Sequence, residues 1–200
     1  MRLPATAHTN QPWRIHEIAR DFRLEDVWAL PTPGGPDEFP RLVQGFLASD
    51  PTQAPSRAVR TLFNIRLKLG ALFGLDEPGT NADAPTLRDR LPAELHNAPR
   101  PEFTALPFTS LYLTGNEFAA ETANKTMHGV LHLGWVPDES TGGYRGQMAI
   151  LVKPNGLFGR AYMAGIAPFR HLIVYPKLIS DIERRWQHRN DEPTLLTPTT

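Results

Sequence analysis

The fold prediction depends most on one stretch, residues 156–189, with the sequence GLFGRAYMAGIAPFRHLIVYPKLISDIERRWQHR. At 100° per residue its apolar side chains fall on one helical face, and most of its charges fall opposite. Pro168 and Pro176 interrupt the pattern, because each removes a backbone donor and crowds the preceding turn. We therefore expect a long helix from about Leu157 to Gln187, kinked at the prolines. Its apolar face consists of Phe158, Tyr162, Gly165, Phe169, Leu172, Ile173, Ile179, Ile182 and Trp186.

Composition limits the classes of protein to which the chain can belong. Its 200 residues carry 21 Lys+Arg and 21 Asp+Glu, and this balance argues against a nucleic-acid partner. The absence of Cys excludes disulfides and thiolate metal sites. The apolar run at 161–169 is too short for a transmembrane segment, which needs about 20 residues, and the N-terminus lacks the apolar core of a secretory signal. We therefore expect a cytoplasmic protein.

The N-terminal residues carry weak structural signals. Residues 1–12 are polar, and we expect a loose arm. Residues 13–18, WRIHEI, alternate in a way that fits a short strand or an extended arm, and residues 26–30 are predicted to form a strand. The breaker PTPGGP, residues 31–36, ends this part of the chain.

Helical spacing follows the breaker. Apolar residues recur at i, i+3, i+4, i+7 and i+8 over residues 39–47, and a second stripe predicts a helix over residues 56–73. Residues 76–107 are rich in Pro, Asp, Asn and Gly and are predicted to form a long loop, in which residues 87–91 make a turn of helix.

The pattern then changes to a period of two residues. Strands are predicted at 109–114, 117–124, 127–136 and 144–152, separated by turn residues. Because the connections are short, the strands should pair antiparallel. A sheet with one apolar face must bury it, and the amphipathic C-terminal helix is the obvious cover.

These elements predict an α+β fold in a single domain. We assign residues 1–12 to the arm, residues 13–189 to the domain and residues 190–200 to a flexible tail. The tail contains two prolines, several threonines and little apolar surface to bury.

Four phrases give the chain a family resemblance. They are HGVLHLGW at 128–135, YRGQMA at 144–149, GRAY at 159–162 and PFRHLI at 168–173. They resemble domain-of-unknown-function family 2867, a branch of the START / polyketide-cyclase (SRPBCC, helix-grip) superfamily, over about residues 13–186. The resemblance implies a curved antiparallel sheet wrapped around a long, Pro-kinked C-terminal helix. It also implies a pocket between sheet and helix that takes lipids, polyketides or other apolar molecules.

Apolar side chains on two predicted strands and on the C-terminal helix are the candidate lining of such a pocket. Aromatic and Met side chains suit adaptable apolar sites, although each one alone is more often plain core packing. No cofactor is expected. The candidate ligand-binding residues are Leu131, Leu133, Trp135, Met148, Ile150, Tyr162, Phe169 and Ile173.

Three ionisable residues are candidates for acid–base catalysis in the same pocket: His132, Tyr112 and Tyr162. The His128-x-x-x-His132 spacing does not indicate a metal site, because residues four apart on a strand lie about 13 Å from each other. Histidines on the outer sheet face or near a loop are the simpler interpretation. Glu117 and Glu121 share a strand face, and a surface role explains these two carboxylates as well as acid–base work does.

Two main hypotheses follow. The first is a binding module that holds an apolar small molecule or lipid. The second is an enzyme of the polyketide cyclase, dehydratase or isomerase type that uses His or Tyr as the acid–base group. A third reading makes the C-terminal helix the interface of a homodimer. The hypotheses differ in whether an ionisable group points into the apolar pocket, and the sequence does not identify the ligand.

Overall fold

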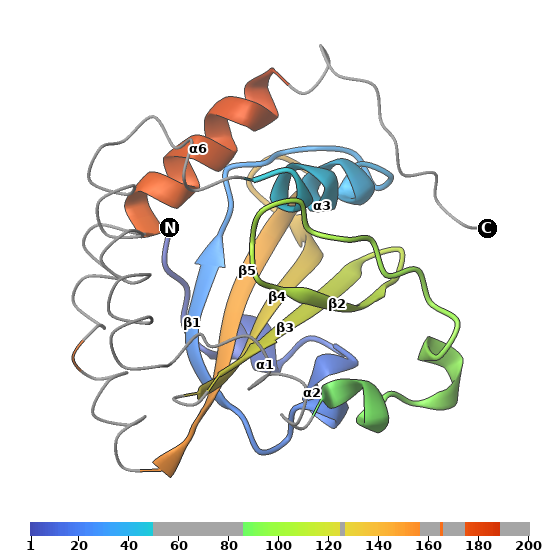
Figure 1. Ribbon diagram of the computed structural model, residues 1–200. Coiled ribbons are helices and arrows are strands. Elements are labelled where there is room, and N and C mark those ends of the chain that lie inside the picture. Colours follow the sequence, from blue (N-terminus) through green and yellow to red (C-terminus); the bar gives the residue numbers. More distant parts are fainter. Residues whose placement is uncertain (50–85, 125–126, 157–164, 166–174, 189–200) are drawn as a thin grey trace.

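The computed structural model describes residues 1–49, 86–124, 127–156, 165 and 175–188. Its centre is one antiparallel five-stranded sheet in the order β1-β5-β4-β3-β2, which confirms the predicted α+β class (Figure 1). The strands are β1 Arg23–Ala29, β2 Thr109–Leu113, β3 Glu117–Ala123, β4 Met127–Asp138 and β5 Gly143–Pro154. The described helices are α1 Thr6–Thr9, α2 Ile15–Ile18, α3 Phe39–Leu47 and α6 Tyr175–Gln187, with 3-10 helices η2 Leu87–Arg90 and η3 Ala93–Leu95.

Period-two alternation places the side chains of the central strands as predicted. Leu131 and Leu133 of β4 stand opposite Ile150 and Met148 of β5 in the antiparallel register. They point to one face of the sheet, whereas His132, the residue between them, points to the other. Because strands β4 and β5 are buried on both faces, each face needs its own cover.

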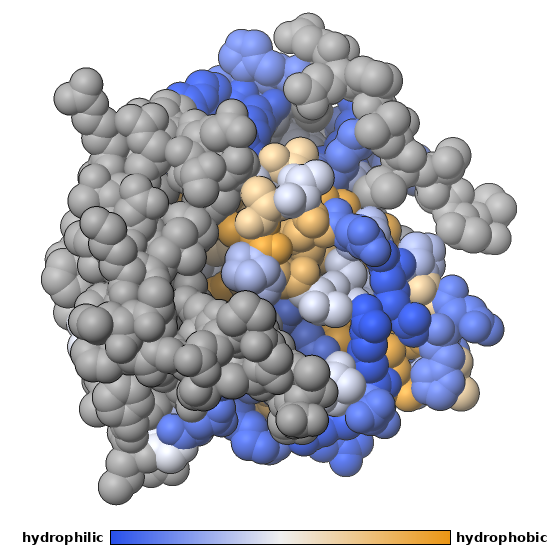
Figure 2. All heavy atoms as spheres, in the orientation of Figure 1, coloured by the Kyte–Doolittle hydropathy of each residue, from blue (hydrophilic) through white to orange (hydrophobic). Residues whose placement is uncertain are grey.

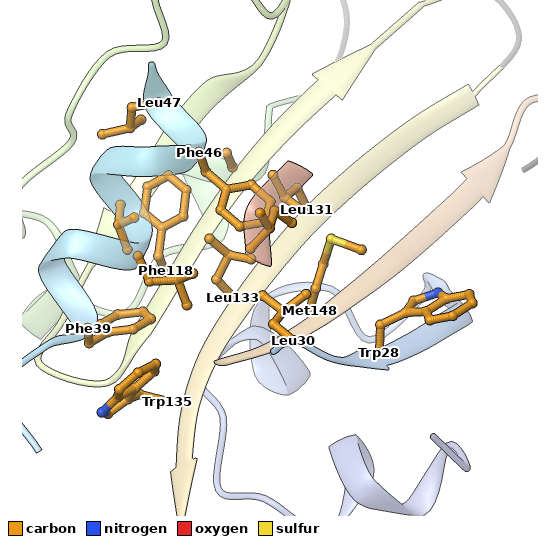
Figure 3. Packing of buried hydrophobic residues seen from close by; sticks show 14 of the residues in the cluster. Trp28, Leu30, Phe39, Phe46, Leu47, Phe118, Leu131, Leu133, Trp135 and Met148 are labelled. Atoms are coloured by element: carbon orange, nitrogen blue, oxygen red, sulfur yellow. The ribbon is translucent and has the colours of Figure 1, made fainter. Parts of the chain in front are cut away.

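Helices α3 and α6 cover the first face (Figure 1). The spacing of α3 turns Phe39, Phe46 and Leu47 toward the sheet, where they pack on the strand side chains (Figure 3). Helix α6 adds Ile182 and Trp186. We call this set the first core; its strand residues include Trp28, Phe118, Leu131, Leu133, Trp135 and Met148.

The second face is covered by the N-terminal segment and by the two 3-10 helices. Trp13, Ile15 and Ile18 pack there, together with Leu87 of η2 and Leu95 of η3. We call this set the second core; its strand residues include Val27, Leu111, Tyr112, Ala119, Val130, Val136, Ala149 and Leu151.

Two N-terminal segments differ from their predicted form. Residues 13–18 were expected to be extended, but they contain the helical turn α2. The physical reason is tertiary: the carboxylate of Glu117 on β3 accepts the backbone N–H groups of Arg14 and Ile15 at the start of this turn. A four-residue turn is too short for a helical period to appear in the sequence.

The expected loose arm, residues 1–12, is instead held against the sheet. Leu3 N donates to Val27 O, Ala29 N donates to Met1 O, and Arg2 makes a β-bridge with Trp28. His8 of α1 is 1% exposed. The polar composition was misleading because backbone hydrogen bonds and the buried His8 hold much of this segment.

The described C-terminal helix, α6, is short, at 13 residues. Most of the longer helix expected from residue 157, with the kink at Pro168, lies outside the described residues, as does the helix expected at 56–73. The long kinked helix is therefore not confirmed. The predicted helix at 39–47 and the turn at 87–91 are both present, as α3 and η2.

Gly134 of β4 lets Trp13 lie against the strand. A Cβ at this position would come within 2.6 Å of Cζ2 of Trp13, a residue that is 4% exposed. Replacing Gly134 with Ala should therefore cost about 1–3 kcal/mol by overpacking the second core. Replacing Gly115, where an added Cβ meets nothing within 4 Å, should change stability by less than about 0.5 kcal/mol. Urea unfolding of both variants measures the difference, and equal costs would contradict this packing.

Candidate functional site

Two glutamate–histidine pairs repeat along strands β3 and β4 on the second face. Glu117 stands opposite Gly134 and Glu121 opposite Val130, so each glutamate lies diagonal to a histidine two residues away on β4. The distance from Nε2 of His132 to Oε1 of Glu117 is 3.0 Å, and that from Nε2 of His128 to Oε2 of Glu121 is 2.7 Å. The two glutamates are four residues apart on β3 and the two histidines are four residues apart on β4, so the two pairs occupy equivalent positions along the strands.

The carboxylate of Glu117 is the centre of a buried polar network. It accepts hydrogen bonds from Arg14 N at 2.9 Å, Ile15 N at 3.0 Å and Tyr112 Oη at 2.6 Å, besides the one from His132. The residue is 3% exposed, and Tyr112 and His132 are fully buried. These four donors supply the compensation that a buried charge requires.

Three histidines continue this network toward the surface. Nδ1 of His132 lies 3.1 Å from Nε2 of His8, and Nδ1 of His8 lies 3.1 Å from Nε2 of His16. An ionised carboxylate only accepts, so His132 carries its proton on Nε2. When all three imidazoles are neutral, Nε2 of His8 then donates to His132, and Nε2 of His16 donates to His8. We call the set Glu117, His132, His8 and His16 the histidine chain.

Burial and neighbouring charges shift the pKa values in this network. Burial, helped by the neighbouring His132 and His16, lowers the pKa of His8 from 6.5 to about 3. Burial also lowers the pKa of His16. Burial alone would raise the pKa of Glu117, but the hydrogen bonds from His132 and Tyr112 outweigh it and lower the pKa. Burial, followed by the charge of Glu117, raises the pKa of Tyr112 well above 10.

The histidine chain links half-buried His16 to Glu117 through an unbroken series of hydrogen bonds. Each step is one hydrogen bond long, and His16 is the most exposed member. Acid–base chemistry on a substrate would also need access to His132 or Tyr112, and both are 0% exposed. These hydrogen bonds therefore attach α1 and α2 to the sheet. The attachment is sensitive to protonation because the pKa of His8 is lowered.

The second pair is more accessible. His128 lines a cleft with a volume of about 80 Å³, together with residues of η2, β3 and β5. Behind it, Glu121 accepts hydrogen bonds from Leu87 N at 2.9 Å and from Thr86 Oγ1 at 2.5 Å. We call this the His128 cleft.

The structure separates the two sets of candidate site residues. Leu131, Leu133, Trp135 and Met148 are buried in the first core, and Ile150 is partly buried against it. The candidates Tyr162, Phe169 and Ile173 lie outside the described residues, so the prediction that these eight residues line an apolar pocket stays a prediction.

The ionisable candidates His132 and Tyr112 meet at Glu117 on the opposite face. They are buried there by α1, α2 and Trp13, whereas the simpler interpretation placed the histidines on an outer sheet face or near a loop.

Sequence reasoning missed the glutamates and the N-terminal histidines. The sequence left Glu117 and Glu121 undecided between acid–base work and a surface role, and His8 and His16 were not considered. One signal was present: glutamates four apart on one strand and histidines four apart on the next face each other when the strands pair antiparallel. The role of His8 and His16 was not readable, because it depends on how the N-terminal segment docks.

A family model described as "Protein of unknown function (DUF2867)" matches residues 18–177 of the chain. The chain belongs to this family. The DUF2867 match includes Glu117, Glu121, His128 and His132 but begins after His16, so the outer half of the histidine chain lies outside it. No curated protein and no solved structure matches the chain.

Two features are absent from the described residues. None of the helices in them has the length and apolar character needed to cross a membrane. In the same part of the chain, no three His, Asp or Glu side chains are grouped to hold a metal ion. The members of the histidine chain follow one another in a line, which explains why they do not form a coordination shell.

Replacing Glu117 with Ala should cost about 3–5 kcal/mol of stability, because it leaves four buried donors without their acceptor. Glu94 provides the control: its ion pair with Arg14 is surface-exposed, so Glu94→Ala should cost under about 1 kcal/mol. Urea unfolding at neutral pH compares them. A cost below 1 kcal/mol for Glu117→Ala would show that the network contributes little.

Stability should fall as the solution is acidified below pH 6.5. The pKa of His8 is about 3 in the folded protein and 6.5 without these surroundings, so the unfolded chain binds the proton first. The contribution is fully present above pH 6.5 and is lost progressively between pH 6.5 and 3. At pH 5 the loss is on the order of 2 kcal/mol. Urea unfolding at pH 7 and pH 5 measures it, and His8→Gln should flatten the dependence. An unchanged slope in this variant would refute the assignment.

Proposed function

We propose that this protein binds an apolar small molecule or lipid on the first face of the sheet, beside α3 and α6. The observation that carries the proposal is a set of apolar side chains that pack against the first core and yet are only partly buried. These residues are Phe103, Phe108, Leu113, Tyr144, Ile150, Leu178 and Ile179.

The surface view supports this location. An apolar area is visible at the centre of Figure 2, with hydrophilic residues to its right. Two of the partly buried residues that pack against the first core are aromatic neighbours: the ring centroid of Phe103 lies 5.5 Å from that of Phe108 and 6.1 Å from that of the buried Phe118. Flat aromatic surfaces over a preformed apolar floor suit a ligand without charges.

The separation of the two faces also favours binding over catalysis. The strand residues of the first core are apolar, whereas His132 and Tyr112 belong to the second face. The sequence hypotheses differed on this point: an apolar pocket without an ionisable partner favours a binding module. A helix-grip arrangement, with the pocket between sheet and C-terminal helix, is part of the same proposal.

The cyclase-like alternative retains one specific observation. His132 and Tyr112 share the carboxylate of Glu117, as a general acid–base pair would. It requires the N-terminal segment to move before a substrate can reach them, and we therefore rank it second.

An environment-sensitive apolar dye should bind the folded protein stoichiometrically and be displaced by a long-chain fatty acid. Leu113→Ser should weaken dye binding about tenfold, because a polar group replaces apolar contact surface. Leu24→Ser is the matched control: Leu24 is also a partly buried strand leucine, but it packs against the second core. Fluorescence titration of the three proteins gives the comparison.

Sedimentation of the same samples separates ligand binding from self-association. If the unmodified protein is a dimer that binds no dye, and Leu113→Ser converts it to a monomer, the apolar surface is a dimer interface and the binding proposal fails. Equal loss of dye affinity in both leucine variants would also refute the location.

A further inference from the structure

The His128 cleft holds more hydrogen-bond donors than it has acceptors to satisfy them. Two carboxylates near the cleft are both engaged: Glu121 by Thr86, Leu87 and His128, and Asp21 by Arg90 and Lys153. Its polar lining is Thr86, Arg90, Asn124, His128, Lys153 and Asn155.

Two cations stand at the rim of the cleft and share one carboxylate. Nη1 of Arg90 lies 2.5 Å from Oδ1 of Asp21, and Nζ of Lys153 lies 2.7 Å from Oδ2. A guanidinium has five N–H groups and an ammonium three, so one carboxylate does not exhaust them. Since both cations share the single carboxylate of Asp21, N–H groups remain at the rim that can donate to a second anion.

Below the rim, His128 offers the cleft a hydrogen-bond acceptor instead of a donor. Glu121 is ionised near neutral pH, because the hydrogen bonds from His128 and Thr86 outweigh its burial and lower its pKa. It therefore requires the proton of His128 on Nε2. In the neutral imidazole Nδ1 is then an acceptor, and it has no hydrogen-bond partner among the described residues. The ring is fixed by Glu121 and by an edge contact with Phe22, whose centroid is 4.9 Å away.

The size of the cleft limits the ligand to one small group. Its volume of about 80 Å³ exceeds the roughly 10–15 Å³ that a single water needs and falls well below the roughly 300–1,000 Å³ of a drug-sized site. We propose that the His128 cleft binds a small oxyanion that also carries a hydroxyl group, such as hydrogen phosphate or a 2-hydroxycarboxylate. The anionic oxygens face Arg90 and Lys153, and the hydroxyl donates to Nδ1 of His128. The proposal is independent of the apolar surface on the other face.

Two pairs of anions test this arrangement on the unmodified protein at pH 8, where an ordinary imidazole is neutral. Phosphate retains a proton at this pH and sulfate does not, and glycolate has the hydroxyl that acetate lacks. Histidine ring signals in ¹⁵N-labelled protein report binding at His128. The hydroxyl-bearing anion of at least one pair should bind about tenfold more tightly than its partner. The pair that shows the preference identifies the tetrahedral or the planar oxyanion as the ligand.

Lysine variants test the rim. Lys153→Ala should weaken binding of the preferred anion about tenfold. Lys177→Ala removes the same charge from the exposed side of α6, away from the cleft, and should leave the affinity unchanged. Equal affinities within both pairs, no saturable binding, binding that leaves the His128 signals unmoved, or equal effects of the two lysine variants would each overturn the proposal.

Discussion

The charge of Glu117 is the constraint on which the second core depends. A carboxylate on a central strand can be buried only if donors surround it, and here the donors come from three separate parts of the chain. Two of them are the backbone N–H groups that begin α2. The same charge therefore satisfies the start of a helix, fixes the ring of His132 and holds the N-terminal segment on the sheet.

The sheet consequently has two faces of different chemical character. The first is held by contact between apolar side chains and has partly exposed aromatic residues at its border. The second combines an apolar core with two glutamate–histidine pairs in equivalent positions. One pair is sealed by Trp13 and α1, whereas the other opens to solvent at η2. What covers each pair, more than the pair itself, decides whether it supports the fold or is available to a ligand.

Much of the sheet could be predicted from the sequence, because alternation over strands such as 127–136 and 144–152 reports directly which side chains share a face. Helix α3 was predictable for the same reason, from five apolar residues at helical spacing. Helix α2 was not, because a turn of four residues depends on an acceptor more than one hundred positions away. The candidate site was half predictable: His132 and Tyr112 were named, but their common partner Glu117 and the histidines that bury them depend on tertiary docking.

That docking has a consequence for the order of events during synthesis on the ribosome. His8 and Arg14 are made well before their partners His132 and Glu117, which lie 124 and 103 positions later. At about 5–20 residues per second, the N-terminal segment waits on the order of 5–20 s before its acceptor exists. During that interval Trp13, Ile15 and Ile18 have no sheet to cover. The segment that completes the second core is thus translated well before the strands that it covers.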